Sequence, residues 1–135
     1  MNRFLIPFAE PEGALRAVDA FLQAPRGDAD TVHLAAVVEP LRPGKVGMFV
    51  SAERAETMVR EAARRWLAPL EAKLAAAGVP FVSEIVLGPP RATIRMLTQR
   101  TDIDRVILPP RTGMLGRRDI EQIRDLSPHP VTVAG

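Results

Sequence analysis

Apolar residues along the chain fall into two alternating patterns. Short, nearly continuous apolar runs are typical of strands buried on both faces. Each run except the last is followed by a segment in which apolar residues recur at helical spacing. The runs predict strands over residues 3–8, 31–38, 79–87, 104–108 and 131–134. The spaced segments predict helices over residues 12–24 and 51–77, after Gly88-Pro89-Pro90, and over 117–126.

Capping and turn residues support the ends of the longest predicted helix. Ser51 is a suitable N-cap and Gly78 a suitable C-terminal stop. Pro69 lies inside this helix, where a proline removes a backbone hydrogen bond and clashes with the preceding turn at a cost of about 3 kcal/mol. We therefore expect either a kink near Arg65-Trp66 or a division into two helices.

The order βαβαβαβαβ predicts a parallel sheet with right-handed crossovers and helices on both faces. Neither an internal repeat nor a linker interrupts it, so we expect one domain over residues 1–135. Ligands of such sheets bind beyond the carboxyl ends of the strands at the topological switch point. The loops after Phe8, Val38 and Leu108 are therefore the candidate ligand site. The loop over residues 39–47, rich in proline and glycine, is a candidate lid.

Composition narrows the class of protein. With 135 residues, 47% hydrophobic and 25% charged, the chain is typical of a globular domain that folds unaided. The absence of cysteine excludes disulfides, thiolate metal sites and thiol nucleophiles. No apolar stretch approaches the about 20 residues of a membrane span, and we expect a cytoplasmic protein with no membrane partner.

Charge is unevenly distributed. Residues 1–90 hold ten basic and eleven acidic side chains, whereas residues 91–135 hold eight and five. Guanidinium groups of the basic third could bind phosphate or an anionic partner, but nearby acids could instead pair with them on a solvated helix face, which we favour. No aromatic residue follows Phe81 to stack on bases, which argues against nucleic acid. The arginines in question are Arg111, Arg117, Arg118 and Arg124, and the acids are Asp119, Glu121 and Asp125.

Catalytic patterns are absent from the sequence. His33 lies in a predicted core strand and His129 between two prolines, without the spacing of metal ligands. Ser51, Ser83 and Ser127 lack the flanking glycines of a nucleophile elbow. We expect no catalytic residue, no metal and no enzyme, with slow nucleotide hydrolysis left open.

Several segments match a known family in order and spacing. The first strand and its turn resemble the family's opening strand, turn and helix, and other segments resemble its second strand, its Gly-x-Pro-x-x-x-Ile turn, its Asp-x-Ile-Val strand and its terminal Pro-x-Pro-Val strand. These other segments are residues 31–40, 87–94, 104–108 and 127–133. Together they resemble the universal stress protein family over essentially the whole chain. The resemblance implies a three-layer α/β/α fold, a five-stranded parallel sheet of order 3-2-1-4-5, and a homodimer through the C-terminal strand.

The chain departs from the nucleotide-binding branch of that family. That branch carries Gly-x-x-Gly directly after strand four, where glycines let backbone N–H groups approach phosphates. Here Pro109 and Thr112 hold those positions, and Pro109 and Pro110 lack N–H donors. A Gly-x-x-Gly occurs four residues later, at Gly113 and Gly116.

Two further family features are missing. After nine residues that follow Gly116, the chain has Leu126-Ser127 where the family has Gly-Ser/Thr. About five residues are also absent before the last strand. Ala9 stands where the family carries an acid after strand one, with Glu10 next to it. Glu10 could replace that acid, but an acid near a helix start is more simply explained by the helix dipole.

These observations favour a stress-response protein that uses no cofactor and acts as a homodimer through contacts with an unknown protein. The alternative is an ATP- or AMP-binding sensor that uses a remodelled loop after strand four. A third hypothesis is an anion or nucleic-acid binder that uses the C-terminal arginines. The residues expected at the switch-point pocket are Phe8, Ala9, Val38, Pro109, Arg111, Gly113 and Gly116.

Overall fold

The computed structural model describes residues 2–40, 51–110 and 115–135, and it contains every element that the pattern predicts. The strands are β1 (Arg3–Phe8), β2 (Thr31–Val38), β3 (Phe81–Leu87), β4 (Arg105–Leu108) and β5 (Val131–Val133). The helices are α1 (Pro11–Gln23), α2 (Ala52–Ala76), α3 (Pro90–Leu97) and α4 (Arg117–Leu126).

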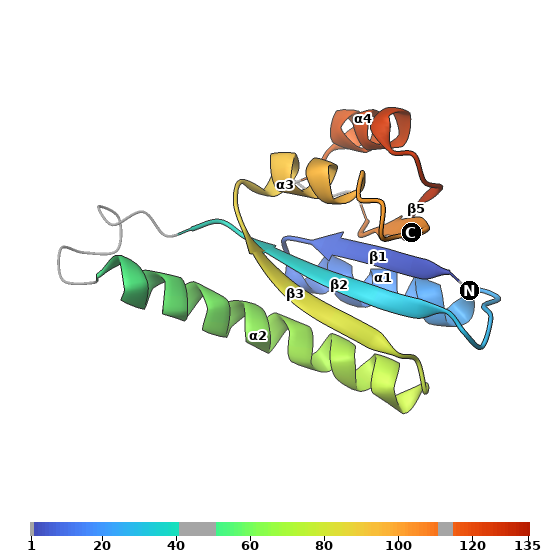
Figure 1. Cartoon of the computed structure of the whole chain (residues 1–135), viewed down its shortest axis with the longest axis horizontal. Coiled ribbons are helices and arrows are strands. Elements are labelled where there is room, and N and C mark those ends of the chain that lie inside the picture. Colours follow the sequence, from blue (N-terminus) through green and yellow to red (C-terminus); the bar gives the residue numbers. More distant parts are fainter. Residues whose placement is uncertain (1, 41–50, 111–114) are drawn as a thin grey trace.

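The five strands form one parallel sheet of order β3-β2-β1-β4-β5, which confirms the predicted order. β1 lies at the centre and pairs with β2 on one side and with β4 on the other (Figure 1). After β1 the chain adds β2 and β3 on one side of the sheet and then β4 and β5 on the other. The carboxyl ends of β1 and β4 therefore define the switch point.

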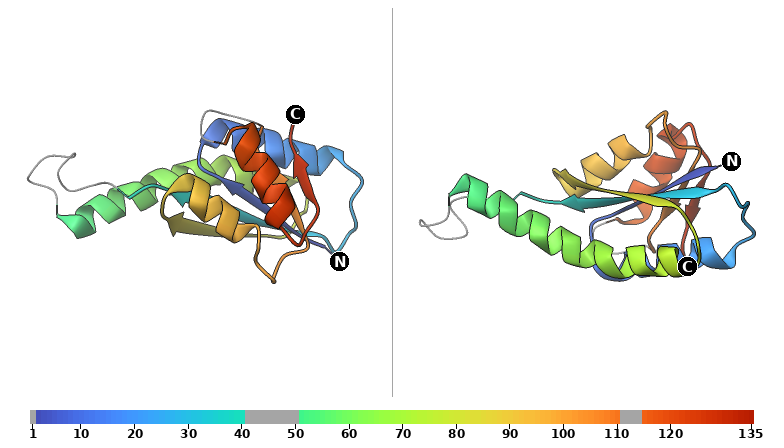
Figure 2. Two further views of the ribbon diagram at one scale, coloured as in Figure 1. Left: turned by 90° about the horizontal axis from the view of Figure 1, so that it is seen from above. Right: turned by 60° about the horizontal axis from the view of Figure 1, so that its bottom comes forward.

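The sheet lies between two helical layers, each with its own core. α1 and α2 cover one face, and α3 and α4 cover the other (Figures 1 and 2). Alternation along β1 places Ile6 in the core under α1 and α2 and Leu5 in the core under α3 and α4, both with no exposed surface. Burial on both faces explains why the strands are apolar without polar alternation.

Helix α2 begins and ends where the sequence predicts. The Ser51 hydroxyl accepts a hydrogen bond from the Arg54 amide at 3.1 Å, and Gly78 has the positive φ of 70° that ends the helix without strain. Of the two alternatives predicted at Pro69, the division into two helices is wrong, because α2 continues through Pro69 as one gently curved helix (Figure 2). Leu67 and Leu70, on either side of the exposed Pro69, are fully buried, and their packing holds the helix together.

The edge strand β5 is covered by helices on only one face. Val131 and Val133 pack against the core under α3 and α4, whereas Thr132 is exposed on the opposite face. Helix α1 packs against β1 and β4. A strip of sheet beside α1 is therefore open to solvent.

Candidate functional site

The switch point lies where β1 ends at Phe8 and β4 ends at Leu108. Among the described residues, the space there is lined by Ala9, Glu10, Gly13, Ile94, Pro109, Pro110 and Leu115, and its volume is about 10 Å³. That is roughly what one water molecule needs, and far below the about 300–1,000 Å³ of small-molecule pockets. This space alone is too small for a nucleotide.

Close packing of Gly13 against Pro109 closes this space. A β-carbon built on Gly13 would lie 2.8 Å from the β-carbon of Pro109, well inside the about 3.5 Å contact distance of two carbons. Glycine in the first turn of α1 thus lets the helix approach the segment after β4. The proline ring occupies the volume over that first turn.

The N-terminus of α4, a natural anion site in such folds, already holds a carboxylate. The Gly116 amide donates to Asp119 Oδ2 at 2.9 Å, and Arg91 Nε lies 3.7 Å from the same oxygen. The Asp119 side chain is only 18% exposed. This carboxylate neutralises the positive end of the helix dipole that a phosphate would otherwise use.

The structure brings together only part of the predicted pocket. Ala9 and Pro109 line the small space at the switch point. Phe8 and Val38 are buried in the core under α1 and α2, and Gly116 does not line the space. The other two predicted residues, Arg111 and Gly113, lie outside the described residues, as do Thr112 and positions 41–47 of the candidate lid.

Sequence reasoning missed Gly13 and the capping role of Asp119. Asp119 follows Gly116 by three residues, the spacing at which an acid bonds back to the N-cap amide, so this signal was present in the sequence. Gly13 carries a weaker signal, a glycine near a helix start. Its significance comes from Pro109, which is distant in sequence.

The C-terminal arginines behave mainly as a solvated helix face. Arg117 Nε lies 3.3 Å from Glu121 Oε1, and the two side chains are 80% and 60% exposed. Arg118 and Arg124 are also exposed. Such exposed pairs contribute little to stability, and this arrangement favours the solvated face over an anion site.

The serines and His129 have structural partners. Ser51 caps α2, the Ser83 hydroxyl donates to Glu71 Oε2 at 2.6 Å, and the Ser127 hydroxyl donates to the Thr98 carbonyl at 2.9 Å. His129 Nε2 forms a hydrogen bond with the Arg100 carbonyl. Within the described residues, no three His, Asp or Glu side chains lie close enough to hold a metal ion.

Acidic side chains at the amino ends of the strands have lowered pKa values. Hydrogen bonding from Arg100 lowers the pKa of Asp102, and the backbone amide of Arg3, 2.8 Å from Asp104 Oδ2, lowers the pKa of Asp104. Arg100 also pairs with Glu84 of β3. These contacts tie the loop before β4 to β1 and β3.

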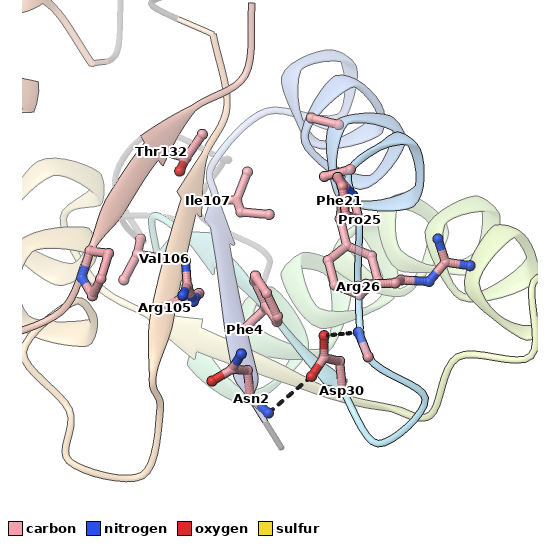
Figure 3. Close-up of a pocket in the computed structure, with 14 residues that line it drawn as sticks. Asn2, Phe4, Phe21, Pro25, Arg26, Asp30, Arg105, Val106, Ile107 and Thr132 are labelled. Atoms are coloured by element: carbon pink, nitrogen blue, oxygen red, sulfur yellow. Dashed lines mark hydrogen bonds between the residues drawn. The ribbon is translucent and has the colours of Figure 1, made fainter.

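A larger hollow lies at the opposite end of the sheet from the switch point. Its volume is about 560 Å³, within the range of small-molecule pockets. Figure 3 shows Arg105, Ile107 and Thr132 on the sheet side and Phe21 on the α1 side, with Phe4 between them. The hollow is the strip of β4 and β5 left open beside α1.

Asp30 fixes the mouth of this hollow. Its two carboxylate oxygens accept hydrogen bonds from the backbone amides of Asn2, at 3.0 Å, and Gly27, at 2.8 Å (Figure 3). The residue is 7% exposed. The Asp30 carboxylate thus links the start of β1 to the turn after α1 through two backbone hydrogen bonds.

A parallel sheet of order 3-2-1-4-5 between two helical layers defines a class of α/β proteins whose ligands bind at the β1/β4 switch point. Within that class the chain belongs to the universal stress protein family, whose pattern matches residues 1–134. No curated protein sequence matches the chain.

Solved structures share the fold at low identity. Hypothetical protein MJ0577 is 22% identical with a TM-score of 0.76, and the match covers 98% of this chain and 94% of that one. A universal stress protein family member from Burkholderia pseudomallei is 15% identical with a TM-score of 0.70, over 98% and 94%. A family member from Arabidopsis thaliana, solved with AMP bound, is 15% identical with a TM-score of 0.64, over 98% and 90%.

None of the helices in the described part of the chain is long and apolar enough to cross a membrane.

Proposed function

We propose that this universal stress protein works without ATP or any other cofactor and without catalysis, as a cytoplasmic homodimer that acts through contacts with another protein. The observation that carries the proposal is the space of about 10 Å³ at the switch point. A nucleotide there would have to displace the contact between Gly13 and Pro109.

The chemistry of the same region supports the proposal. Pro109 and Pro110 have no amide hydrogen to offer a phosphate. The Gly116 amide is engaged by Asp119, whose negative charge would repel a phosphate at the start of α4. Both the donors and the electrostatics therefore disfavour a polyphosphate.

Extraction of small molecules from the purified protein tests the absence of a nucleotide. We expect mass spectrometry to find ATP, ADP and AMP only in traces far below the amount of protein. Recovery of one nucleotide per chain would contradict the proposal.

The homodimer is inferred from the free edge of β5. The Val106 amide donates to the Pro130 carbonyl at 3.0 Å, and the Ala134 amide donates to the Leu108 carbonyl at 2.9 Å. Because alternate residues of a strand bond to opposite sides, the backbone groups of Val131 and Val133 face away from β4. An edge of this kind is a template for pairing with a second copy.

The substitution Val133→Pro tests this edge because it removes an outward amide. We expect light scattering to give a dimer mass for the unchanged protein and a monomer mass for the variant, with circular dichroism unchanged. Val82→Ser, at an exposed position of the other edge strand, serves as the control and should stay dimeric. A monomeric unchanged protein, or a dimeric Val133→Pro variant, would contradict the dimer.

The second candidate function is a sensor of AMP or ATP that uses the loop after β4. The AMP bound to the Arabidopsis thaliana relative favours it. Arg111 would then supply the phosphate contact, with Gly113 and Gly116 in the loop. Under this hypothesis AMP copurifies with the protein and is lost in an Arg111→Gln variant. Absence of AMP from both preparations would rule the sensor out.

A further inference from the structure

We propose that the hollow of about 560 Å³ at the amino ends of β1 and β4 binds a small amphipathic monocarboxylate, with its carboxylate at Arg105 and its apolar body against Phe4 and Ile107. This site lies at the opposite end of the strands from the switch point. It does not depend on whether a nucleotide binds there.

The sheet provides an apolar floor. Phe4 of β1 and Arg105 of β4 are register partners, and Ile107 follows two residues later on the same face. Phe21 of α1 packs edge-to-face on Phe4, with ring centroids 4.9 Å apart. This pair and Ile107 form a rigid surface suited to an aromatic or alkyl body.

The rim provides one uncommitted cation. Arg105 is exposed, and its guanidinium forms no hydrogen bond or ion pair within the described segments. Arg26 is already engaged, because its guanidinium donates to the Leu22 carbonyl at 2.7 Å and lies 5.7 Å from the centroid of the Phe21 ring. Figure 3 shows the Arg26 side chain directed away from the sheet. Arg105 is therefore the guanidinium available to a carboxylate.

Neutral donors also line the hollow, and the one carboxylate of its lining already accepts two backbone hydrogen bonds. The Thr132 hydroxyl and the Asn2 side-chain amide line the hollow and can each donate to a carboxylate oxygen. Asp30 accepts a backbone amide at each oxygen. With a single free guanidinium and a carboxylate nearby, the hollow suits one negative charge better than a polyphosphate.

The hydrogen bonds of Asp30 hold the hollow in its shape before a ligand binds. They fix the start of β1 against the turn after α1, so the wall at Pro25 and Gly27 is held in place without a ligand. A preformed site loses little conformational entropy on binding.

Titration of naphthalene carboxylate into the isotope-labelled full chain, followed by backbone amide shifts, tests the proposal. We expect saturable shifts centred on Phe4, Ala20, Ile107 and Thr132. Arg105→Gln should weaken binding about tenfold or more, the usual effect of losing a charge-assisted hydrogen bond. Arg118→Gln, an exposed arginine on α4 outside the hollow, is the matched control and should bind like the unchanged protein.

Two further binding experiments separate the contribution of the ligand's charge from that of its shape. Naphthalene carboxamide has the same body without the charge, and we expect it to bind about tenfold more weakly or worse. Ala20→Leu places a larger side chain in the hollow from α1 and should reduce binding of both compounds.

The proposal is overturned by absence of saturable shifts, by equal affinity for acid and amide, or by an Arg105→Gln variant that binds like the unchanged protein. It is also overturned if Arg105→Gln changes the oligomeric mass, because the hollow would then belong to an interface between copies. Failure of the proposed function would be distinguishable, because ATP binding at the switch point would shift the backbone amide signals of Ala9 and Gly13 instead.

Discussion

Gly13 in the first turn of α1 and Pro109 after β4 are in such close contact that the glycine has no room for a β-carbon. The two residues are 96 positions apart in the sequence (109 minus 13). Their contact joins the first turn of α1 to the segment after β4 at the switch point, where this class of sheet binds ligands.

Gly13→Ala is expected to destabilise the protein by about 1–3 kcal/mol, the usual cost of overpacking. The new β-carbon would lie 2.8 Å from Pro109 Cβ, so α1 or the proline must shift. Urea denaturation measures the free energy of unfolding. In a Pro109→Gly background, where that β-carbon is absent, the cost of Gly13→Ala should fall. Equal costs in both backgrounds would show that the contact is unimportant.

Asp119→Ala is expected to lower the free energy of unfolding by about 1 kcal/mol, because the Gly116 amide and the positive end of α4 lose their partner. Asp125→Ala is the matched control on the same helix. It lies near the C-terminus of α4, where a negative charge is unfavourable, so its removal should be neutral or slightly stabilising. Equal losses for the two variants would contradict the capping role of Asp119.

Pro69→Ala is expected to raise the melting temperature. Pro69 is exposed within an unbroken helix, and alanine restores an amide that can donate to the carbonyl of Arg65. The gain could reach the about 3 kcal/mol by which proline is disfavoured inside helices. Ala68→Pro, one position earlier on the same exposed face, should lower the melting temperature. A melting temperature unchanged by Pro69→Ala would mean that α2 has adapted fully to its proline.

Stability is expected to fall in acid through Asp102 and Asp104. Hydrogen bonds from Arg100 and from the Arg3 amide hold their pKa values below the ordinary 3.8, so the folded protein binds fewer protons than the unfolded chain in that range. Their contribution is complete above the unfolded pKa and is lost as pH falls through the lowered folded pKa.

The acid effect is measured by urea denaturation from neutral pH down to about pH 3. Asp104→Asn should be less stable than the unchanged protein at neutral pH, and the difference should shrink in acid. Asp28→Asn, at an exposed aspartate in the turn after α1, is the control for removing one surface charge and should cost less stability at neutral pH than Asp104→Asn. A difference for Asp104→Asn that is constant with pH would contradict the assignment.

The fold was predictable because its signals are local. Continuous apolar runs mark strands buried on two faces, and Ser51 and Gly78 mark the ends of α2. The division considered as one alternative at Pro69 does not occur. Tertiary packing of Leu67 and Leu70 outweighs the lost backbone bond there.

The site was less predictable because it depends on contacts between distant residues. The sequence shows that Pro109 and Pro110, which lack amide donors, begin the loop in which the family has glycines. Only the structure shows that Pro109 contacts Gly13. The hollow beside Arg105 could not be predicted at all. It arises because β5 receives no helix on one face, a consequence of how α1 lies over β1 and β4.

Isothermal titration calorimetry of ATP with magnesium, and of AMP, tests the central claim most directly. With Gly13 against Pro109 and Asp119 at the start of α4, we expect no saturable heat up to about millimolar nucleotide. Binding of either nucleotide with a dissociation constant of about 1 µM, near −8 kcal/mol, would contradict the account.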